Sequence, residues 1–195
     1  MIEVEKKFNL TEEEIARLIS GATFVKELVI HDTYFDTDDY RLTLKDMWLR
    51  NREGKFEMKV PTHKRKDFLF ADYRELTTEE EIRSAIGFIE KGLLQDLLEK
   101  NGFTPFAKLV STRRKYKKDD FTFDIDSIDY GYNVAEIELM VTTDKEAEEA
   151  KKKIMALATS LKIEVKIVRG KLTEYMFRFC PAHHKALLDA SILKL

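Results

Sequence analysis

The strongest constraint on the fold of this chain is a charged face that recurs on one predicted β-strand after another. Along these segments ionisable side chains alternate with mainly apolar ones at a period of two, which is typical of strands. The alternating ionisable residues are Glu3, Glu5 and Lys7; Arg50 and Arg52; Glu57 and Lys59; Arg113 and Lys115; Asp124 and Asp126; and Glu136 and Glu138. The charges also segregate by strand, since some segments are acidic and another is basic.

This segregation by sign bears on where the charged faces lie. Like charges two residues apart on one strand face repel each other, so a solvent-exposed sheet gains nothing from them. A closed barrel with a polar interior, covered outside by helices, tolerates such a face. From the alternation alone, two interpretations stay open: solvent-exposed strand faces, or the charged interior of a barrel.

Helical spacing of apolar residues predicts four helical segments between the strands. Capping boxes, in which a Thr precedes a Glu by three positions, mark starts at Thr11 and Thr78. The predicted segments are 11–19, 78–101, 144–161 and 170–180, and Pro181 breaks or kinks the last one. No repeat or flexible linker divides the chain, so we expect a single domain over residues 1–195.

Composition and charge balance exclude several classes of protein. The chain has 34 Lys and Arg against 36 Asp and Glu, a net charge of -2, which argues against nucleic-acid or membrane binding through the overall field. No apolar run approaches the ~20 residues of a transmembrane helix, and no signal peptide is visible. We expect the basic run at residues 63–66 to be a solvated loop. The single cysteine, Cys180, predicts a cytosolic protein without an internal disulfide, and a closed barrel would suit a monomer.

The ionisable faces supply the groups that phosphoryl transfer needs. Carboxylates bind hard divalent cations, and without a cation they repel one another. The candidates are Glu3, Glu5, Glu75, Asp124, Glu136 and Glu138. Arg and Lys bind phosphate, and the candidates are Lys7, Arg50, Arg52, Lys59, Arg113 and Lys171. Together they predict a cavity in which Mg²⁺ or Mn²⁺ bridges a chain of phosphates to the acidic faces.

The motif Glu3-Val4-Glu5-Lys6-Lys7 resembles the Glu-x-Glu-x-Lys signature of the CYTH superfamily, the triphosphate tunnel metalloenzymes. Alone this pattern is weak, and it becomes specific because further matches follow in order across nearly the whole chain. They are Leu49–Arg52, Glu57–Lys59, Tyr73–Leu76, Ser111–Arg113, Asp124–Asp126, Ala135–Glu138 and Gly170–Leu172. The resemblance implies an α+β fold, in which an eight-stranded antiparallel β-barrel forms a tunnel with a charged interior and helices packed outside.

The same resemblance implies a role for each matching residue. Mg²⁺, or Mn²⁺ in its place, would be held by Glu3, Glu5, Asp124, Glu136 and Glu138. The triphosphate would be bound by Lys7, Arg50, Arg52, Lys59, Arg113 and Lys171. Lys7 and Glu138 are the candidates to assist proton transfer, and the sequence does not assign a general base.

Within the superfamily, several stretches resemble the animal-type thiamine triphosphatases. They include Asp32–Thr37, Trp48–Arg50, Asp129–Tyr132 and Arg178–Pro181. In those enzymes aromatic residues at the positions of Tyr34 and Trp48 hold the thiamine rings, and a cationic thiazolium over an aromatic face is a favourable contact. Without the resemblance, both side chains are better explained as packing residues.

One departure from those enzymes concerns phosphate binding. Thr122, two residues before Asp124 and of the same parity, stands where they have an arginine, and Arg114 and Lys115 are the candidates to compensate. Asp126 matches the metal ligands less well, so we expect it to support a ligand rather than to be one.

The resemblance implies a Mg²⁺-dependent hydrolase that converts thiamine triphosphate to thiamine diphosphate and phosphate. The first alternative is an inorganic tripolyphosphatase or nucleoside triphosphatase of the same barrel, which needs the same ions and no aromatic residues. An adenylyl cyclase ranks lower because Met1-Ile2 stands where such cyclases carry a His-Phe extension. A non-catalytic polyphosphate sensor is another alternative, but a protein that only binds anions has no need of so many carboxylates. If none of these functions applies, the chain would be a structural domain with a charged surface.

Overall fold

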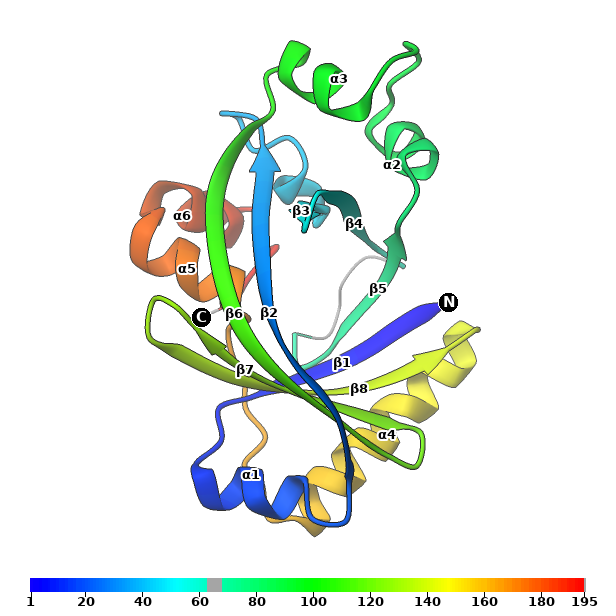
Figure 1. Ribbon diagram of the computed structural model, residues 1–195, viewed down its shortest axis with the longest axis vertical. Helices are drawn as coiled ribbons and strands as arrows, with labels where there is room; N and C mark the ends of the chain where they lie inside the picture. Colours follow the sequence, from blue (N-terminus) through cyan, green and yellow to red (C-terminus); the bar gives the residue numbers. More distant parts are fainter. Residues whose placement is uncertain (63–67, 195) are drawn as a thin grey trace.

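The computed structural model describes residues 1–62 and 68–194, and within them eight antiparallel strands close into one β-barrel (Figure 1). The strands are β1 (Ile2–Phe8), β2 (Thr23–Asp36), β3 (Trp48–Arg52), β4 (Lys55–Pro61), β5 (Ala71–Leu76), β6 (Thr104–Lys118), β7 (Phe121–Ile128) and β8 (Tyr132–Val141). β1 pairs with β5 on one side and with β8 on the other, which closes the sheet. The predicted barrel is confirmed, and the basic run at residues 63–66 lies outside the described residues.

Helices cover the outside of the strand wall (Figure 1). They are α1 (Glu12–Leu18), α2 (Glu79–Ile86), α3 (Leu94–Lys100), α4 (Asp144–Ser160), α5 (Lys171–Phe179) and α6 (Pro181–Asp189), with a short 3₁₀ turn η1 (Thr43–Lys45). Capping boxes start α1 at Thr11 and α2 at Thr78, as the sequence predicts. Pro181 is the first residue of α6, where its missing N–H leaves no helical hydrogen bond unmade.

Three hydrophobic clusters fill the space between the strand wall and the helices. One joins β1, β7 and β8 to α1 and α4, a second joins β3, β4 and β5 to α2 and α3, and a third joins β6 to α5 and α6. Ile137, Met58 and Met176 are fully buried members of the three clusters. Because the apolar face of each strand points outward to these clusters, the alternating ionisable side chains point into the barrel.

A two-residue turn sets the register of the strands that carry much of the basic face. Glu53 and Gly54 connect β3 to β4 with φ angles of 50° and 83°, the left-handed conformations that suit a tight hairpin. The resulting register places Trp48 opposite Lys59 and Arg50 opposite Glu57. Side chains from both strands therefore meet on the inner wall.

The prediction of one helix over residues 78–101 is wrong, because two short helices occupy this segment. α2 ends at Gly87, which adopts a left-handed conformation (φ 91°) that glycine reaches without a Cβ clash. Ile89, whose position fits the helical spacing of apolar residues in this segment, is 97% exposed in the connection between α2 and α3. The apolar spacing continues beyond the break because both helices pack on one cluster, Ile82 from α2 and Leu98 from α3.

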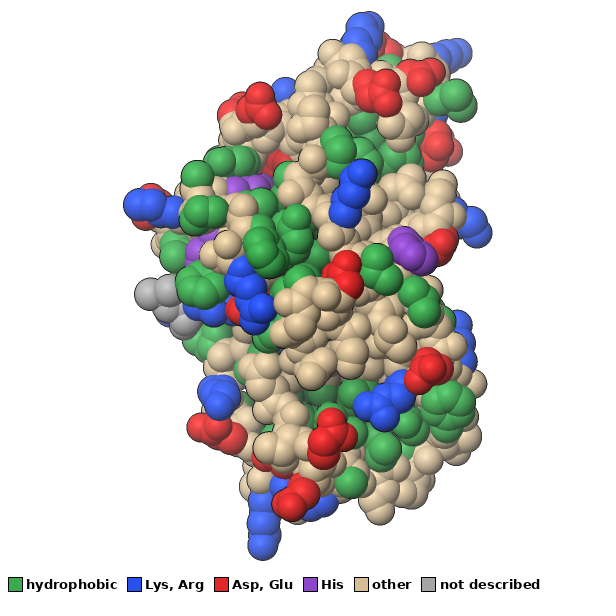
Figure 2. All heavy atoms as spheres, turned by 60° about the vertical axis from the view of Figure 1, so that its left-hand side comes forward, with side chains coloured by type: hydrophobic (Ala, Val, Ile, Leu, Met, Phe, Trp, Pro, Cys, Tyr) green, Lys and Arg blue, Asp and Glu red, His purple; other side chains and the backbone are tan. Residues whose placement is uncertain are grey.

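The face that carries α5 and α6 has a mixed surface, on which hydrophobic side chains lie among charged ones (Figure 2). Phe177 and Phe179 of α5 are about half exposed. None of the helices in the described part of the chain is long and apolar enough to span a bilayer.

Acidification is expected to destabilise the fold through His183, which is buried between α6 and η1. Its Nε2 lies 2.7 Å from Thr43 Oγ1, and its ring stacks on Tyr40 with centroids 3.9 Å apart. Burial lowers the pKa of His183 below its usual value of 6.5. The unfolded chain therefore takes up this proton first, and the free energy of unfolding falls as the pH drops below about 6.5. Urea denaturation at about pH 7.5 and at about pH 5.5 measures how much free energy of unfolding is lost between the two. This loss should be smaller in His183→Gln than in the wild-type protein. An equal loss in the variant and the wild type would contradict the role of His183.

Candidate active site

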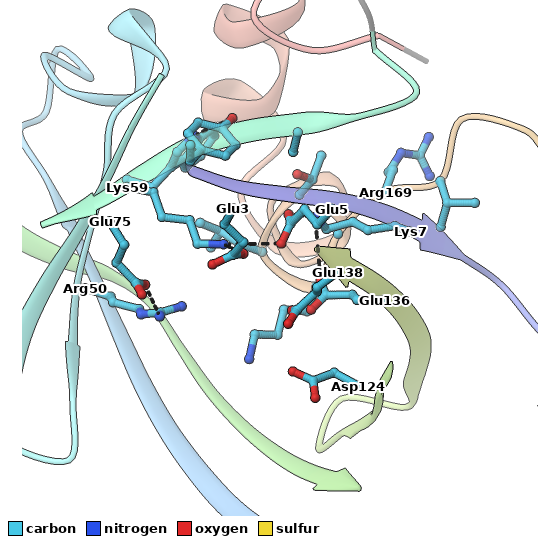
Figure 3. A pocket seen from close by; sticks show the side chains of 18 of the residues that line it. Glu3, Glu5, Lys7, Arg50, Lys59, Glu75, Asp124, Glu136, Glu138 and Arg169 are labelled. Carbon is cyan, nitrogen blue, oxygen red and sulfur yellow. Dashed lines mark hydrogen bonds and ion pairs between the residues drawn. The ribbon is translucent and has the colours of Figure 1, made fainter. Parts of the chain in front are cut away.

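A cavity of ≈ 320 Å³ lies inside the barrel, within the range of about 300–1,000 Å³ found for ligand pockets (Figure 3). Its wall brings together every residue that the sequence predicts for metal, triphosphate and thiamine binding. These are Glu3, Glu5, Lys7, Tyr34, Trp48, Arg50, Arg52, Lys59, Arg113, Asp124, Glu136, Glu138 and Lys171. Their individual roles stay predictions, and their convergence comes from seven strands and the start of α5.

Two groups of three carboxylates stand out in this wall among the described residues, and both include Glu138. Glu3 and Glu5 on β1 form one group with it, and Asp124 on β7 and Glu136 on β8 form the other. Within each group the ligand oxygens lie within 4.8 Å of one another. The register explains the convergence, because Glu138 stands opposite Glu5 and Glu136 stands opposite Asp124.

Burial and repulsion raise the pKa of two of these carboxyls. Burial, with a contribution from Glu5, raises the pKa of Glu3 to about 7, although Lys59 opposes the shift. Burial, followed by the charges of Asp124 and Glu136, raises the pKa of Glu138 well above its usual range. A divalent cation between the oxygens would offset this repulsion, and an all-carboxylate donor set suits a hard cation. The residues present therefore fit a metal of the predicted kind.

Two lysines are paired with the acidic groups inside the cavity. Lys59 Nζ lies 2.6 Å from Glu3 Oε1 and 3.3 Å from Glu5 Oε2. Lys7 contacts Glu5 and lies 3.6 Å from Glu136. Burial alone would raise the pKa of Glu5, but Lys59 and Lys7 together hold it well below its usual range. The same carboxylates raise the pKa of both lysines, which are therefore cationic at neutral pH.

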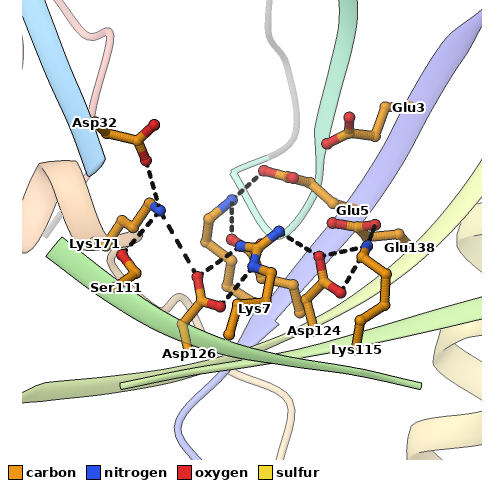
Figure 4. Close-up of polar contacts among 12 residues, drawn as sticks. Glu3, Glu5, Lys7, Asp32, Ser111, Lys115, Asp124, Asp126, Glu138 and Lys171 are labelled. Carbon is orange, nitrogen blue, oxygen red and sulfur yellow. Dashed lines mark hydrogen bonds and ion pairs between the residues drawn. The ribbon is translucent and has the colours of Figure 1, made fainter. Parts of the chain in front are cut away.

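Arg113 and Lys115 supply positive charge beside the second carboxylate group, and Figure 4 shows Lys115 next to Asp124. Arg113 donates two bonds of 2.6 Å to Asp126, one of 3.0 Å to Glu136 and one to Asp124. Lys115 Nζ donates to Asp124 Oδ2 at 2.8 Å and lies 3.9 Å from Glu138.

These positions bear on the departure at Thr122. Lys115 lines the cavity and Arg114 does not, so of the two candidates only Lys115 is placed to compensate. Asp126 does not line the cavity and contacts Arg113 instead, in keeping with the supporting place expected for it.

Asp32, for which the sequence predicts no role, supports two residues of the cavity wall from behind. Its side chain is completely buried on β2 and accepts hydrogen bonds from Arg52 Nε at 2.7 Å and Nη2 at 3.0 Å. Lys171 Nζ lies 2.9 Å from Oδ2, the oxygen that also accepts from Arg52 Nη2 (Figure 4). Although burial would raise the pKa of Asp32, Arg52, Lys171 and Arg50 lower it. The negative charge of Asp32 therefore offsets the repulsion between Arg52 on β3 and Lys171 on α5 and keeps the two cations close together.

Glu75, one of the candidate carboxylates, lies outside both metal-type groups. Its Oε1 accepts a hydrogen bond of 2.8 Å from Arg50 Nη2, and Glu57 contacts the same guanidinium at 2.7 Å. These two carboxylates fix the position of the Arg50 guanidinium, and Figure 3 shows it beside Glu75 at the cavity wall.

Aromatic and aliphatic side chains form another part of the wall, beside further polar residues that include Arg169 and Lys194. Trp48 faces the interior, as its parity predicts, and Tyr34, Tyr73, Phe68 and Leu193 line the same cavity. The cavity therefore combines charged groups suited to phosphates and a metal with rings suited to an organic group.

Comparisons with known proteins agree with this geometry. The sequence profile of the CYTH domain matches residues 1–170. Thiamine-triphosphatase from Homo sapiens is 30% identical over 98% of the chain and 91% of its own length, and the Macaca fascicularis protein of the same name is 29% identical over 100% and 92%. A solved structure from Pyrococcus horikoshii OT3, 23% identical, superposes with a TM-score of 0.67 over 90% of this chain and 98% of its own.

Proposed function

The chain belongs to the CYTH family, and from this premise we propose that it is a Mg²⁺-dependent hydrolase that removes the terminal phosphate of thiamine triphosphate. The products would be thiamine diphosphate and phosphate. The proposal depends on one observation: both carboxylate groups, the Arg and Lys side chains and the aromatic residues line the same cavity. The two mammalian relatives that the chain matches over nearly its full length are both named thiamine-triphosphatase, which supports the same substrate.

The positive residues of the wall would bind and orient the triphosphate. Arg52 and Lys171, fixed by Asp32, and Arg113, fixed by Asp126, are held in place before substrate binds. Lys7 and Lys59, which contact carboxylates of the cavity wall, would contact phosphate oxygens when the substrate binds. There they would stabilise the negative charge that develops in the transition state.

Water activation would take place at the carboxylate groups. A bound Mg²⁺ supplies neutralisation of phosphate charge and a lower pKa for the attacking water. Glu3, Glu5, Asp124, Glu136 and Glu138 would hold it. Glu138 is also a candidate to accept a proton from the water, in the ionised form that a bound cation would favour.

The aromatic residues would bind the thiamine. A thiazolium cation over the Trp48 ring is worth on the order of 1–2 kcal/mol when water is excluded. A tripolyphosphatase activity is the second candidate, since the charged residues of the wall do not depend on the aromatic ones. We further propose a cytosolic monomer, because the described strands close into a barrel without a terminal strand and the chain has one cysteine.

The test compares kcat/KM for thiamine triphosphate and for inorganic tripolyphosphate in saturating Mg²⁺. We expect a preference of about 100-fold or more for the thiamine compound. Trp48→Leu should reduce this preference by about tenfold, because the ring contact is lost. Phe179→Leu, on the outer surface of α5, is the matched control. A preference for tripolyphosphate would reject the thiamine assignment, and no phosphate release from either compound would favour a non-catalytic polyphosphate binder.

A further inference from the structure

A buried carboxylate outside the cavity holds two of its aromatic residues. Asp46 is 6% exposed, and its Oδ1 accepts hydrogen bonds from Trp48 Nε1 at 2.9 Å and from Tyr73 Oη at 2.6 Å. The indole N–H also lies 3.3 Å from the Tyr73 oxygen, so the three polar groups meet at one point. Trp48 and Tyr73 come from β3 and β5, which lie on either side of β4. One oxygen atom thus ties together two rings from separate strands.

The backbone that carries Asp46 is itself well anchored. Asp46 ends η1 in a left-handed conformation (φ 59°), which Asp and Asn tolerate better than most residues. Its N–H donates to the Thr43 carbonyl at 3.0 Å. At the start of the same turn, Asp36 accepts from the N–H groups of Leu42 and Thr43 at 3.0 and 2.9 Å.

We propose that Asp46 is a positioning residue that sets the preference of the cavity for a triphosphate carrying a cationic aromatic group. This inference rests on the proposed function. By fixing the indole and the phenol, Asp46 presents the ring faces before the ligand arrives, so that binding does not have to order them. Without the carboxylate, Tyr73 Oη would lose its bond to Asp46 and Trp48 Nε1 would keep only the longer contact with the Tyr73 oxygen, so the two rings would be free to reorient.

The position of Asp46 separates this effect from phosphate binding. The cations that would bind the phosphates are held by other carboxylates, Arg52 by Asp32 and Arg50 by Glu57 and Glu75. A change at Asp46 should therefore affect the organic part of a substrate more than its phosphates.

Three variants test the proposal by kcat/KM for thiamine triphosphate and for tripolyphosphate. Asp46→Ala should lower the ratio of the two values by about tenfold, as expected for a lost cation–π geometry. Asp46→Asn keeps an acceptor oxygen and the left-handed backbone, and should retain most of the ratio. Thr43→Val is the matched control, because it deletes a buried hydrogen bond of 2.7 Å from the same turn without touching the rings.

Fluorescence gives a readout that does not depend on turnover, since Trp48 is the only tryptophan of the chain. Titration with thiamine diphosphate should quench the emission of the wild-type protein. Asp46→Ala should shift the emission and weaken this binding by about tenfold, whereas Thr43→Val should do neither.

The outcomes separate the inference from the proposed function. An unchanged substrate ratio in Asp46→Ala, or equal losses for both substrates, overturns the positioning role. If the wild-type protein does not hydrolyse thiamine triphosphate, the proposed function fails, and the fluorescence titration decides the inference alone. Quenching that depends on Asp46 then supports it, and the absence of quenching overturns it.

Discussion

Glu138→Gln abolishes phosphate release while the barrel stays folded: this is the largest effect on activity that we expect from one substitution. Glu138 belongs to both carboxylate groups, so its replacement removes a ligand from each. Glutamine keeps the volume and hydrogen-bonding capacity but neither binds a hard cation strongly nor accepts a proton. We expect kcat to fall by about 1,000-fold or more, which corresponds to about 4 kcal/mol.

Three measurements check this expectation. Phosphate release in saturating Mg²⁺ gives kcat, Mn²⁺ titration by electron paramagnetic resonance gives metal affinity, and thermal denaturation gives stability. The loss of activity should be accompanied by weaker Mn²⁺ binding, and the raised pKa of Glu138 predicts no loss of stability in the metal-free protein. Glu149→Gln, which removes an exposed carboxylate paired with Lys152 on α4, is the control. Normal turnover in Glu138→Gln would refute a metal or proton-transfer role for this residue.

The charged interior of the barrel was predictable because its strands alternate regularly. On β1, β7 and β8 the outward residues pack against helices, so every second residue must point inward. The alternation along each strand predicted which side chains share a face. It did not predict whether that face is exposed to solvent or lies inside a closed barrel. The order of motifs along the chain suggested closure, and the pairing of β1 with both β5 and β8 provides it.

Asp32 was missed because β2 does not alternate along its whole length. The first part of β2 is exposed on both faces, and burial begins to alternate only near Ile30. β2 and β6 run side by side through the height of the molecule (Figure 1), and the exposed first part of β2 pairs with β6 alone, because β3 joins β2 only from Asp32 on. The partners of Asp32 lie on β3 and α5, so their convergence depends on tertiary structure. For the same reason, the contact of Asp46 with Tyr73 could not be read from the sequence.

Arg113→Met is expected to cause the largest loss of stability. The Arg113 side chain is 12% exposed and contacts Asp124, Asp126 and Glu136, of which the two aspartates are 0% and 1% exposed. Methionine has a similar length and no charge, so these carboxylates would lose a cation that they share. Removing one partner from a buried ion pair costs about 3–5 kcal/mol, mainly because charge is left uncompensated. Urea denaturation of the metal-free protein measures the loss. Arg178→Met, which breaks a partly exposed pair with Glu174 and leaves that carboxylate its second partner, Arg169, should cost about 1 kcal/mol or less.

The dependence of this loss on pH and on cations identifies its cause. Arg113 is one of the charges that lower the pKa of Glu136, so its removal raises that pKa in the folded protein. The folded variant then binds more protons than the folded wild type, so its free energy of unfolding gains less than that of wild type as the pH rises. The deficit relative to wild type should therefore be larger at about pH 8 than at about pH 5.5. Added Mg²⁺ should reduce the deficit, because the cation would neutralise carboxylates that Arg113 no longer neutralises and so stabilise the folded variant more than the folded wild type. A deficit that is independent of both pH and Mg²⁺ would mean that Arg113 contributes packing rather than charge, and that the carboxylates around it do not repel one another strongly enough to need a cation.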